Sequence, residues 1–213
     1  MIITHHGADF FKVSHGDTTI AFNPVSKHSK LKGAKFGADI ALISLEHPDM
    51  NGAEQVAHGD KQPFVIRGPG EYEVQDILIK GYPTSSTYGG QDLINTAYVV
   101  QMEKMTLLFL GALNTKTLPT DLKETLDHVD IVFVPIGGEG VLEPAPAHEL
   151  AVAIEASIVI PTHWSGVGIK DALQIFLKEE GTENGNHKPL EKLTIKAKDL
   201  EGQQNNVVVL ASK

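Results

Sequence analysis

Short apolar runs separated by turn residues dominate the first half of the chain. Residues 10–13 and 18–22 flank a polar turn, and this arrangement predicts a β-hairpin. Residues 40–43 are continuously apolar, which is typical of a strand covered on both faces. Further strands, each bounded by Gly, Pro, Asn or Ser, are predicted at 64–66, 77–79, 98–100 and 107–110. The first half is therefore expected to be mostly sheet.

The second half alternates between helical and strand periods. Leu118, Leu122 and Leu126 recur at helical spacing, with a proline in the first turn. Further elements are predicted in the order strand, helix, strand, helix, at 131–134, 150–154, 157–160 and 172–178. Only residues 181–188 favour a flexible insertion. The pattern predicts an α/β fold in which helices cover layers of sheet, with residues 1–213 forming a single domain.

Composition limits the chemistry that the chain can carry. A chain of 213 residues can bury a sufficient hydrophobic core without disulfide cross-links. The chain has no cysteine, which excludes disulfides, thiolate zinc sites and cysteine nucleophiles. Any metal must therefore be held by histidine, carboxylate or amide groups.

Charge and hydropathy limit the partners. The net charge of -9 and the pI near 5.5 make the average surface repel phosphate backbones, so nucleic acid is disfavoured. The chain begins with neither a basic segment nor a long apolar one, and no apolar run approaches the roughly 20 residues that span a bilayer. We expect a cytoplasmic protein with no membrane contact and a small-molecule ligand. An exposed sheet edge would make a homo-oligomer plausible.

Candidate chemistry lies where predicted strands end. The polar segment 44–52 follows the strand at 40–43 and contains His47 and Asp49. His163 follows the β-branched strand at 157–160 in the same way. The segment after 107–110 has the same layout but nothing ionisable at its tip. Since strand ends in such architectures point into clefts, these loops are the candidate site.

At these places, and through nearly its whole length, the chain resembles the metallo-β-lactamase superfamily, particularly its short, single-domain, metal-dependent hydrolases. The features that carry the resemblance are the opening hairpin, the Asn23-Pro24 step, and the segments 44–52, 68–74, 134–138 and 160–163. Their order and spacing together imply a metallo-β-lactamase-like αββα sandwich.

The resemblance also shows which metal ligands are missing. The family pattern His-x-His-x-Asp-His falls on residues 45–50, where His47 and Asp49 remain but Leu45 and Met50 replace the other two histidines. The remaining family ligands, apart from a retained last histidine at His163, fall near Ala8 and on Asn23, Ser86 and Ala112. Seven ligand positions are thus reduced to His47, Asp49 and His163. We expect either no cofactor or a single zinc or other divalent metal at these three residues.

These losses lead to two hypotheses about function. In the first, the chain has lost dinuclear metal hydrolysis and keeps the scaffold as a binding or interaction module, because catalytic zinc normally needs three protein ligands plus water. In the second, it is an active hydrolase of esters, lactones or phosphodiesters with one relocated metal, and Asp49 orients water as the catalytic residue. Four further polar residues could rebuild such a site: Asp9, Glu46, Asn114 and Glu139. A third class, metal-independent nucleic-acid processing, conflicts with the acidic charge.

Two other polar segments favour structural roles. His5 and His6 are adjacent in a predicted strand, so their side chains point to opposite faces and are unsuited to sharing one ion. Residues 85–90 offer hydroxyls, but no evident base activates one, and the segment favours a mobile rim loop.

Overall fold

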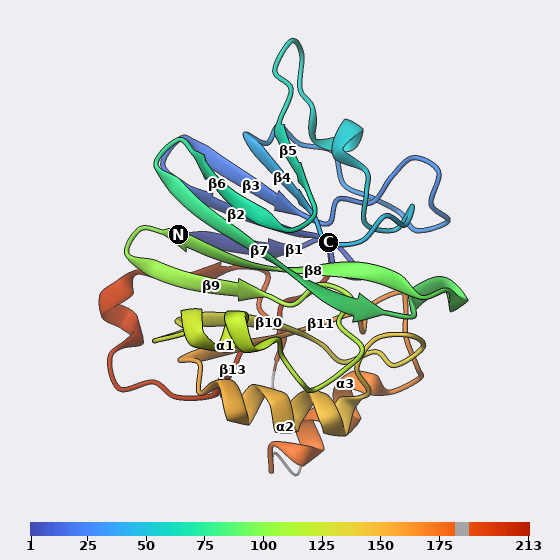
Figure 1. Ribbon diagram of the computed structural model, residues 1–213, viewed down its shortest axis with the longest axis vertical. Coiled ribbons are helices and arrows are strands. Elements are labelled where there is room, and N and C mark those ends of the chain that lie inside the picture. The colour runs from blue at the N-terminus through green and yellow to red at the C-terminus, as the bar shows by residue number, and fades with distance from the viewer. Residues whose placement is uncertain (182–187) are drawn as a thin grey trace.

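Residues 1–181 and 188–213 are described by a computed structural model, in which two β-sheets face one another (Figure 1). The first sheet has six strands within these residues: β1 Ile2–His5, β2 Phe11–His15, β3 Thr18–Phe22, β4 Ile40–Ile43, β5 Phe64–Arg67 and β12 Leu193–Thr194. Their order is β12-β1-β2-β3-β4-β5. Strands β2 and β3 pair in antiparallel fashion, which confirms the predicted hairpin, whereas β3, β4 and β5 run parallel.

The second sheet has seven strands in the described part of the chain. They are β6 Gly70–Val74, β7 Ile77–Ser86, β8 Leu93–Met102, β9 Met105–Phe109, β10 Ile131–Pro135, β11 Ile158–Thr162 and β13 Asn206–Val207. Their order is β13-β11-β10-β9-β8-β7-β6. Strand β6 lies within the segment 68–74 and pairs with β7 as an edge strand of this sheet.

The main core lies between the two sheets. Inward-facing residues such as Phe11, Phe22, Phe109 and Phe133 belong to one apolar cluster and are fully buried. Because side chains alternate along a strand, Leu108 points to the opposite face of its sheet and joins a second cluster. Burial on both faces explains the continuous apolar runs seen in the sequence.

Helices among the described residues cover the outer face of the seven-stranded sheet (Figure 1). The α-helices are α1 Thr120–Thr125, α2 Pro144–Ile154 and α3 Ala172–Glu179. Leu122, Leu150 and Phe176 bring one buried side chain from each helix to this face. Helix α1 is shorter than the leucine spacing predicts, because it ends before Leu126. No helix in the described part of the chain is long and apolar enough to cross a bilayer.

The outer face of the six-stranded sheet has a thinner cover. Val25, Leu31 and Phe36, from the irregular segment between β3 and β4, pack with the 3-10 turn η1 Ala53–Val56 on Ala21 and Ala41. Two further 3-10 turns are η2 Tyr88–Gly90 and η3 Ala197–Leu200. The two-sheet α/β architecture confirms the predicted fold class, with this layer reduced to a loop and one turn. The predicted insertion at 181–188 lies largely outside the described residues.

Unusual backbone positions gather where several strands end. Ala8, Asn23 and His163 have positive φ values of 48°, 46° and 61°, which are uncommon for residues other than glycine. Gly111 also has a positive φ, and a Cβ there would lie 2.4 Å from Ser44 Oγ. These strand ends therefore surround a tightly packed set of polar groups. The sequence predicts the candidate site at the same place.

Candidate functional site

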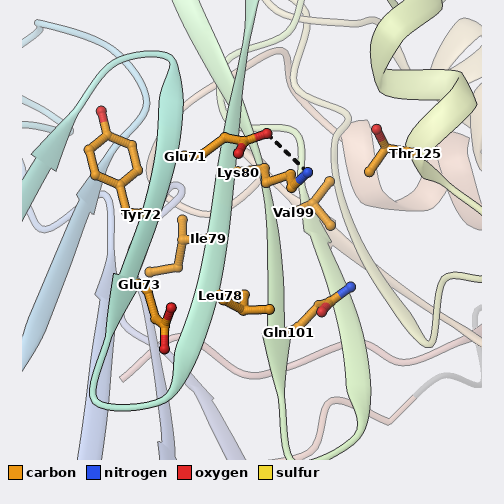
Figure 2. A pocket seen from close by; sticks show the side chains of 9 residues that line it. All are labelled: Glu71, Tyr72, Glu73, Leu78, Ile79, Lys80, Val99, Gln101 and Thr125. Carbon is orange, nitrogen blue, oxygen red and sulfur yellow. Dashed lines mark ion pairs between the residues drawn. The ribbon is translucent and has the colours of Figure 1, made fainter.

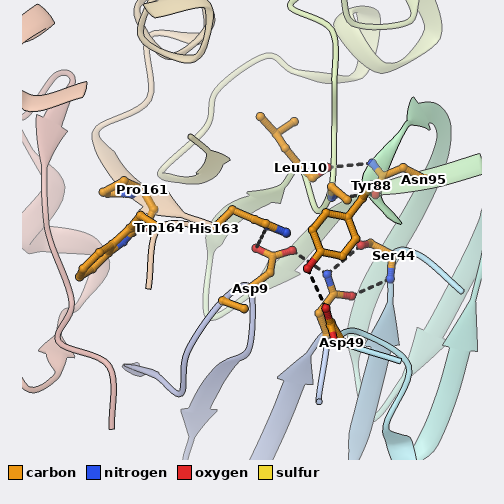
Figure 3. A network of polar contacts seen from close by, with 12 residues as sticks. Asp9, Ser44, Asp49, Tyr88, Asn95, Leu110, Pro161, His163 and Trp164 are labelled. Carbon is orange, nitrogen blue, oxygen red and sulfur yellow. Dashed lines mark hydrogen bonds and ion pairs between the residues drawn. The ribbon is translucent and has the colours of Figure 1, made fainter. Parts of the chain in front are cut away.

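A cluster of polar side chains joins the loops after β1, β3, β4, β7 and β11 (Figure 3). We call it the polar cluster. Its members are Asp9, Asn23, Ser44, His47, Asp49, Tyr88 and His163. All three predicted metal ligands are therefore in one region of the molecule.

Asn23 organises the base of the polar cluster. Its side-chain nitrogen donates hydrogen bonds to Asp9 Oδ2 at 2.6 Å and to Ser44 Oγ at 2.8 Å. Its side-chain oxygen accepts a bond from the Ser44 backbone N–H at 2.7 Å. Asn95, which the sequence did not single out, accepts a bond from the Ala112 N–H and donates one to the Leu110 carbonyl. These two amides fix the ends of β3, β4, β8 and β9 relative to one another.

Both carboxylate oxygens of Asp49 are bonded from within the chain. Ser29 Oγ donates to Oδ1, and the Tyr88 hydroxyl donates to Oδ2 at 2.7 Å. His47 Nδ1 lies 3.6 Å from Oδ2 and accepts a bond from the Asp49 backbone N–H at 3.3 Å. The other ring nitrogen of His47 faces the backbone of Gly89, where a Cβ would lie only 3.1 Å from it. Both oxygens of Asp49 and the Nδ1 atom of His47 are thus engaged within the chain.

The ring of Tyr88 packs edge-on against both candidate imidazoles. Its centroid lies 4.9 Å from that of His47 and 5.1 Å from that of His163. Burial and the Asp49 carboxylate raise the pKa of the phenol, so Tyr88 stays protonated and acts as a donor. Residues 85–90 favoured a rim loop in the sequence, but Tyr88 is turned inward, and the hydroxyl of Ser86 accepts the Tyr88 N–H.

Family ligand positions that carry apolar residues have become a small core. Leu45, Met50 and Ala112 are at most 1% exposed and pack with Val141 into one cluster, against which Tyr88 also packs. Each of the three stands where the resemblance assigns a histidine or an aspartate. The space beside His47 and Asp49 is consequently lined by hydrocarbon and sulfur rather than by hard ligands.

The Asp9 and His163 side of the polar cluster is less complete. Both side chains are fully buried, and His163 Nδ1 lies 3.9 Å from Asp9 Oδ1. Neither ring nitrogen of His163 has a hydrogen-bond partner, and Asp9 Oδ1 has none either. Burial raises the pKa of Asp9 to about 7 and lowers that of His163 to about 3. At neutral pH this imidazole is uncharged.

The other residues proposed to rebuild a metal site have separate surroundings. Glu46 forms an exposed ion pair with Arg67 at 2.7 Å. Asn114 accepts a bond from Ser85 at 2.7 Å. Glu139 has a positive φ of 53° and lines a hollow that also includes Asn114. Asp9 alone joins His163, so the structure brings one of these four residues into direct proximity with a predicted ligand.

The fit of this site to a metal pair can be judged from its donor atoms. Across residues 1–181 and 188–213, no group of three or more His, Asp or Glu side chains is arranged to hold an ion. Both oxygens of Asp49 and Nδ1 of His47 are engaged within the chain, and Leu45, Met50 and Ala112 supply no hard ligands. The residues present do not fit a dinuclear centre in this arrangement. The assignment of His47, Asp49 and His163 to a single ion stays a prediction.

Tyr88 and Ser29 are the functional candidates that the sequence did not reveal. Both lie outside the ligand motif, and they reach Asp49 only through the folding of two separate loops. A tyrosine followed by two glycines was the available signal, because Gly89 and Gly90 both adopt positive φ and form the tight turn that carries Tyr88.

Comparison with protein families gives one match over most of the chain. The Beta-lactamase superfamily domain matches residues 2–163. A UPF0173 metal-dependent hydrolase of Listeria welshimeri is 26% identical over 198 residues, covering 78% of this chain and 86% of the relative. A protein of the same name from Bacillus licheniformis is 23% identical over the same length and coverage.

Solved structures agree at the level of the fold. A protein from Thermotoga maritima, assigned to the zinc-dependent hydrolases of the metallo-β-lactamase superfamily, superimposes with a TM-score of 0.76 and 24% identity, covering 100% of this chain and 99% of that one. A metallo hydrolase from Ignicoccus hospitalis gives a TM-score of 0.63 and 17% identity, with 98% and 94% coverage.

Proposed function

Because this chain belongs to the metallo-β-lactamase superfamily, we propose that it descends from metal-dependent hydrolases but no longer performs dinuclear metal hydrolysis. Its scaffold then serves as a binding or interaction module. A change of function through a few loop residues is compatible with the fold, since a single fold can host many unrelated functions.

A single observation carries the proposal. Leu45, Met50 and Ala112, at three family ligand positions, pack into one buried apolar cluster against which the ring of Tyr88 lies. The three replacements are buried and pack against one another, so these positions contribute to the core instead of presenting ligands.

The chemistry of hydrolysis in this family makes the consequence specific. Two metals sharing a water lower the pKa of that water and stabilise the charge that develops on the substrate. A catalytic zinc ion normally has three protein ligands and an open position. His47, Asp49 and His163 are too few for two such ions, and Tyr88 already bonds Asp49.

A second candidate function is hydrolysis of an ester, lactone or phosphodiester with one metal held by His47, Asp49 and His163. The observation that favours it is the bonding deficit at His163, whose two ring nitrogens are fully buried without a partner. Unpaired buried polar atoms are rare in folded proteins and call for an explanation. In this alternative Asp49 would also orient the attacking water, and Tyr88 would have to leave its place.

Metal analysis separates these two functions. The protein is purified without chelator, and zinc, iron and manganese are measured together with esterase, lactonase and phosphodiesterase activity. The leading proposal expects metal far below one ion per chain and no metal-dependent turnover; about two ions per chain would refute it.

The single-metal alternative makes a different prediction in the same assay. It expects about one ion per chain, lost together with activity in His163→Ala. If His163→Ala leaves both metal content and activity unchanged, the alternative fails. His128→Ala is the matched control, because His128 is 64% exposed and is not one of the predicted metal ligands.

A further inference from the structure

The outer face of the six-stranded sheet carries a second group of polar and charged side chains, apart from the polar cluster. Strands β1 and β2 pair with Thr4 opposite Lys12, whereas the neighbouring pair, Ile3 and Val13, is buried between the sheets. Because successive side chains of a strand alternate, Thr4 and Lys12 face outward. They line a cavity together with residues 34–36 of the loop between β3 and β4.

This cavity, which we call the lysine pocket, has a volume of about 400 Å³. Its cationic lining residues come from four separate parts of the chain: Lys12, Lys35, Lys192 and Lys213. No aspartate or glutamate among the described residues lines it. The whole chain has 27 acidic and 18 basic residues, so such a concentration of one sign runs against the overall balance.

The four lysines have no carboxylate partner within the described ranges. Lys12 instead places its ammonium 4.8 Å from the centroid of the Phe36 ring, which fixes the direction of one charge without neutralising it. Lys35, Lys192 and Lys213 are exposed and free to turn toward a bound group.

Another cavity of the same molecule provides a contrast. A hollow of about 350 Å³ beside the β6–β7 hairpin also contains a lysine, Lys80 (Figure 2). There the ammonium forms an ion pair with Glu71 at 3.0 Å, so its charge is matched within the chain. The lysine of this hollow is therefore paired, whereas the four lysines of the lysine pocket have no carboxylate partner within the described ranges.

The positive charge of the lysine pocket also affects the pKa of a neighbouring histidine. His6 lines the pocket and bonds Thr4 at 3.1 Å. Burial, followed by the charges of Lys213, His5 and Lys12, lowers its pKa to about 4. An anion in the pocket would relieve this repulsion.

We propose that the lysine pocket binds a compact, small-molecule anion carrying one or two phosphate groups. Several ammonium groups can each donate a charge-assisted hydrogen bond to such a group. Phe36 is already in contact with Lys12, His6 and Phe10, so the recognition rests on charge rather than on stacking of an aromatic base.

The size of the ligand follows from the range of electrostatic forces. At physiological salt, charges are screened beyond about 8 Å, so an anion inside the pocket responds mainly to the nearby lysines. A long nucleic acid would extend over the acidic remainder of a chain whose net charge is -9. The site is independent of the polar cluster and does not depend on whether that cluster binds metal.

Calorimetric titration with inorganic pyrophosphate tests the proposal on the full chain in phosphate-free buffer. We expect saturable binding at one site per chain that weakens as salt is added. Lys35→Gln and Lys192→Gln should each weaken it by about five- to tenfold, because each removes one donor to a charged group. Both side chains are exposed and make no described bond, so the variants should fold normally, as circular dichroism will verify.

The matched control is Lys123→Gln, which removes the same charge from an exposed site on α1. It should leave pyrophosphate affinity within a factor of two. Absence of saturable binding, or equal losses in Lys123→Gln and in the pocket variants, would overturn the proposal. So would pyrophosphate binding that is insensitive to Lys35→Gln and Lys192→Gln.

Discussion

In the polar cluster, both oxygens of Asp49 accept bonds from Ser29 and Tyr88, whereas the lysines around the lysine pocket have no carboxylate partner in the described structure. The first region uses its polar groups to hold loops together. The second leaves its charges exposed at the wall of a cavity. Comparing the two shows that ligand-type residues alone do not mark a binding site, because what matters is how much of their bonding capacity remains.

The Asp9 and His163 pair lies between these extremes. These side chains are fully buried, yet Asp9 Oδ1 and both His163 ring nitrogens lack partners. Among the three retained family ligands, His163 is therefore the one whose side-chain nitrogens are both unbonded in the described structure. The substituted positions Leu45, Met50 and Ala112 have been repacked.

Removal of Asn23 should have the largest effect on stability. Asn23→Ala deletes two donated bonds, one of them to the buried Asp9 carboxyl, and one accepted bond. We expect a loss of about 3 kcal/mol in the free energy of unfolding, measured with urea at pH 7. Asn114→Ala, which removes a half-buried amide outside the polar cluster, should cost less than about 1 kcal/mol. Equal losses would contradict a structural role for the polar cluster.

Removal of the Tyr88 hydroxyl should have a smaller effect. Tyr88→Phe keeps the ring contacts with His47 and His163 but leaves Asp49 Oδ2 without its phenol donor. The expected loss is about 1 kcal/mol in the same urea assay. Tyr72→Phe is the control, because that hydroxyl bonds only backbone carbonyls near the surface. A Tyr88→Phe protein as stable as wild type would show that this bond does not hold the loop.

Acidification should weaken the fold through His6. The unfolded chain takes up a proton on this imidazole near its ordinary pKa of 6.5, whereas the folded pKa is about 4. The unfolded state therefore binds more protons between these values, and stability falls as the pH drops from about 6.5 to 4. His6→Gln should make this decline shallower in urea unfolding over that range. An identical decline in wild type and His6→Gln would refute the assignment.

Relief of the repulsion between lysines in the lysine pocket should give the smallest change in the free energy of unfolding. Lys35→Gln should raise stability by a few tenths of a kcal/mol at low ionic strength, and the gain should disappear in high salt. Thermal unfolding with and without added sodium chloride measures it, with Lys123→Gln as the exposed comparison. A destabilised Lys35→Gln protein would mean that Lys35 makes a favourable contact rather than adding to like charge.

Most of the sheet is predictable from the sequence because its strands are continuous apolar runs. Residues 40–43 and 131–134 are buried on both faces, and burial of that kind leaves a direct trace in composition. Strand β6 is not predictable in this way, because as an exposed edge strand it alternates glutamates with half-buried residues. The substitutions at Leu45, Met50 and Ala112 are equally visible in the sequence once the resemblance aligns them.

The partners of these residues are not visible in the sequence. Tyr88 meets Asp49 only because two loops fold against each other, across 39 positions of chain. Lys12 and Lys192 likewise become neighbours through the pairing of β12 with β1 and of β1 with β2. Contacts of this kind depend on topology, whereas the apolar periods that predict strands are local.

Crystals grown with excess zinc and measured at the zinc absorption edge test the central claim most directly. The account predicts that Tyr88 still donates to Asp49 and that no anomalous peak lies within ligand distance, about 2.0–2.2 Å, of His47 or Asp49. Two strong peaks with complete coordination shells beside those residues, and a displaced Tyr88, would contradict it.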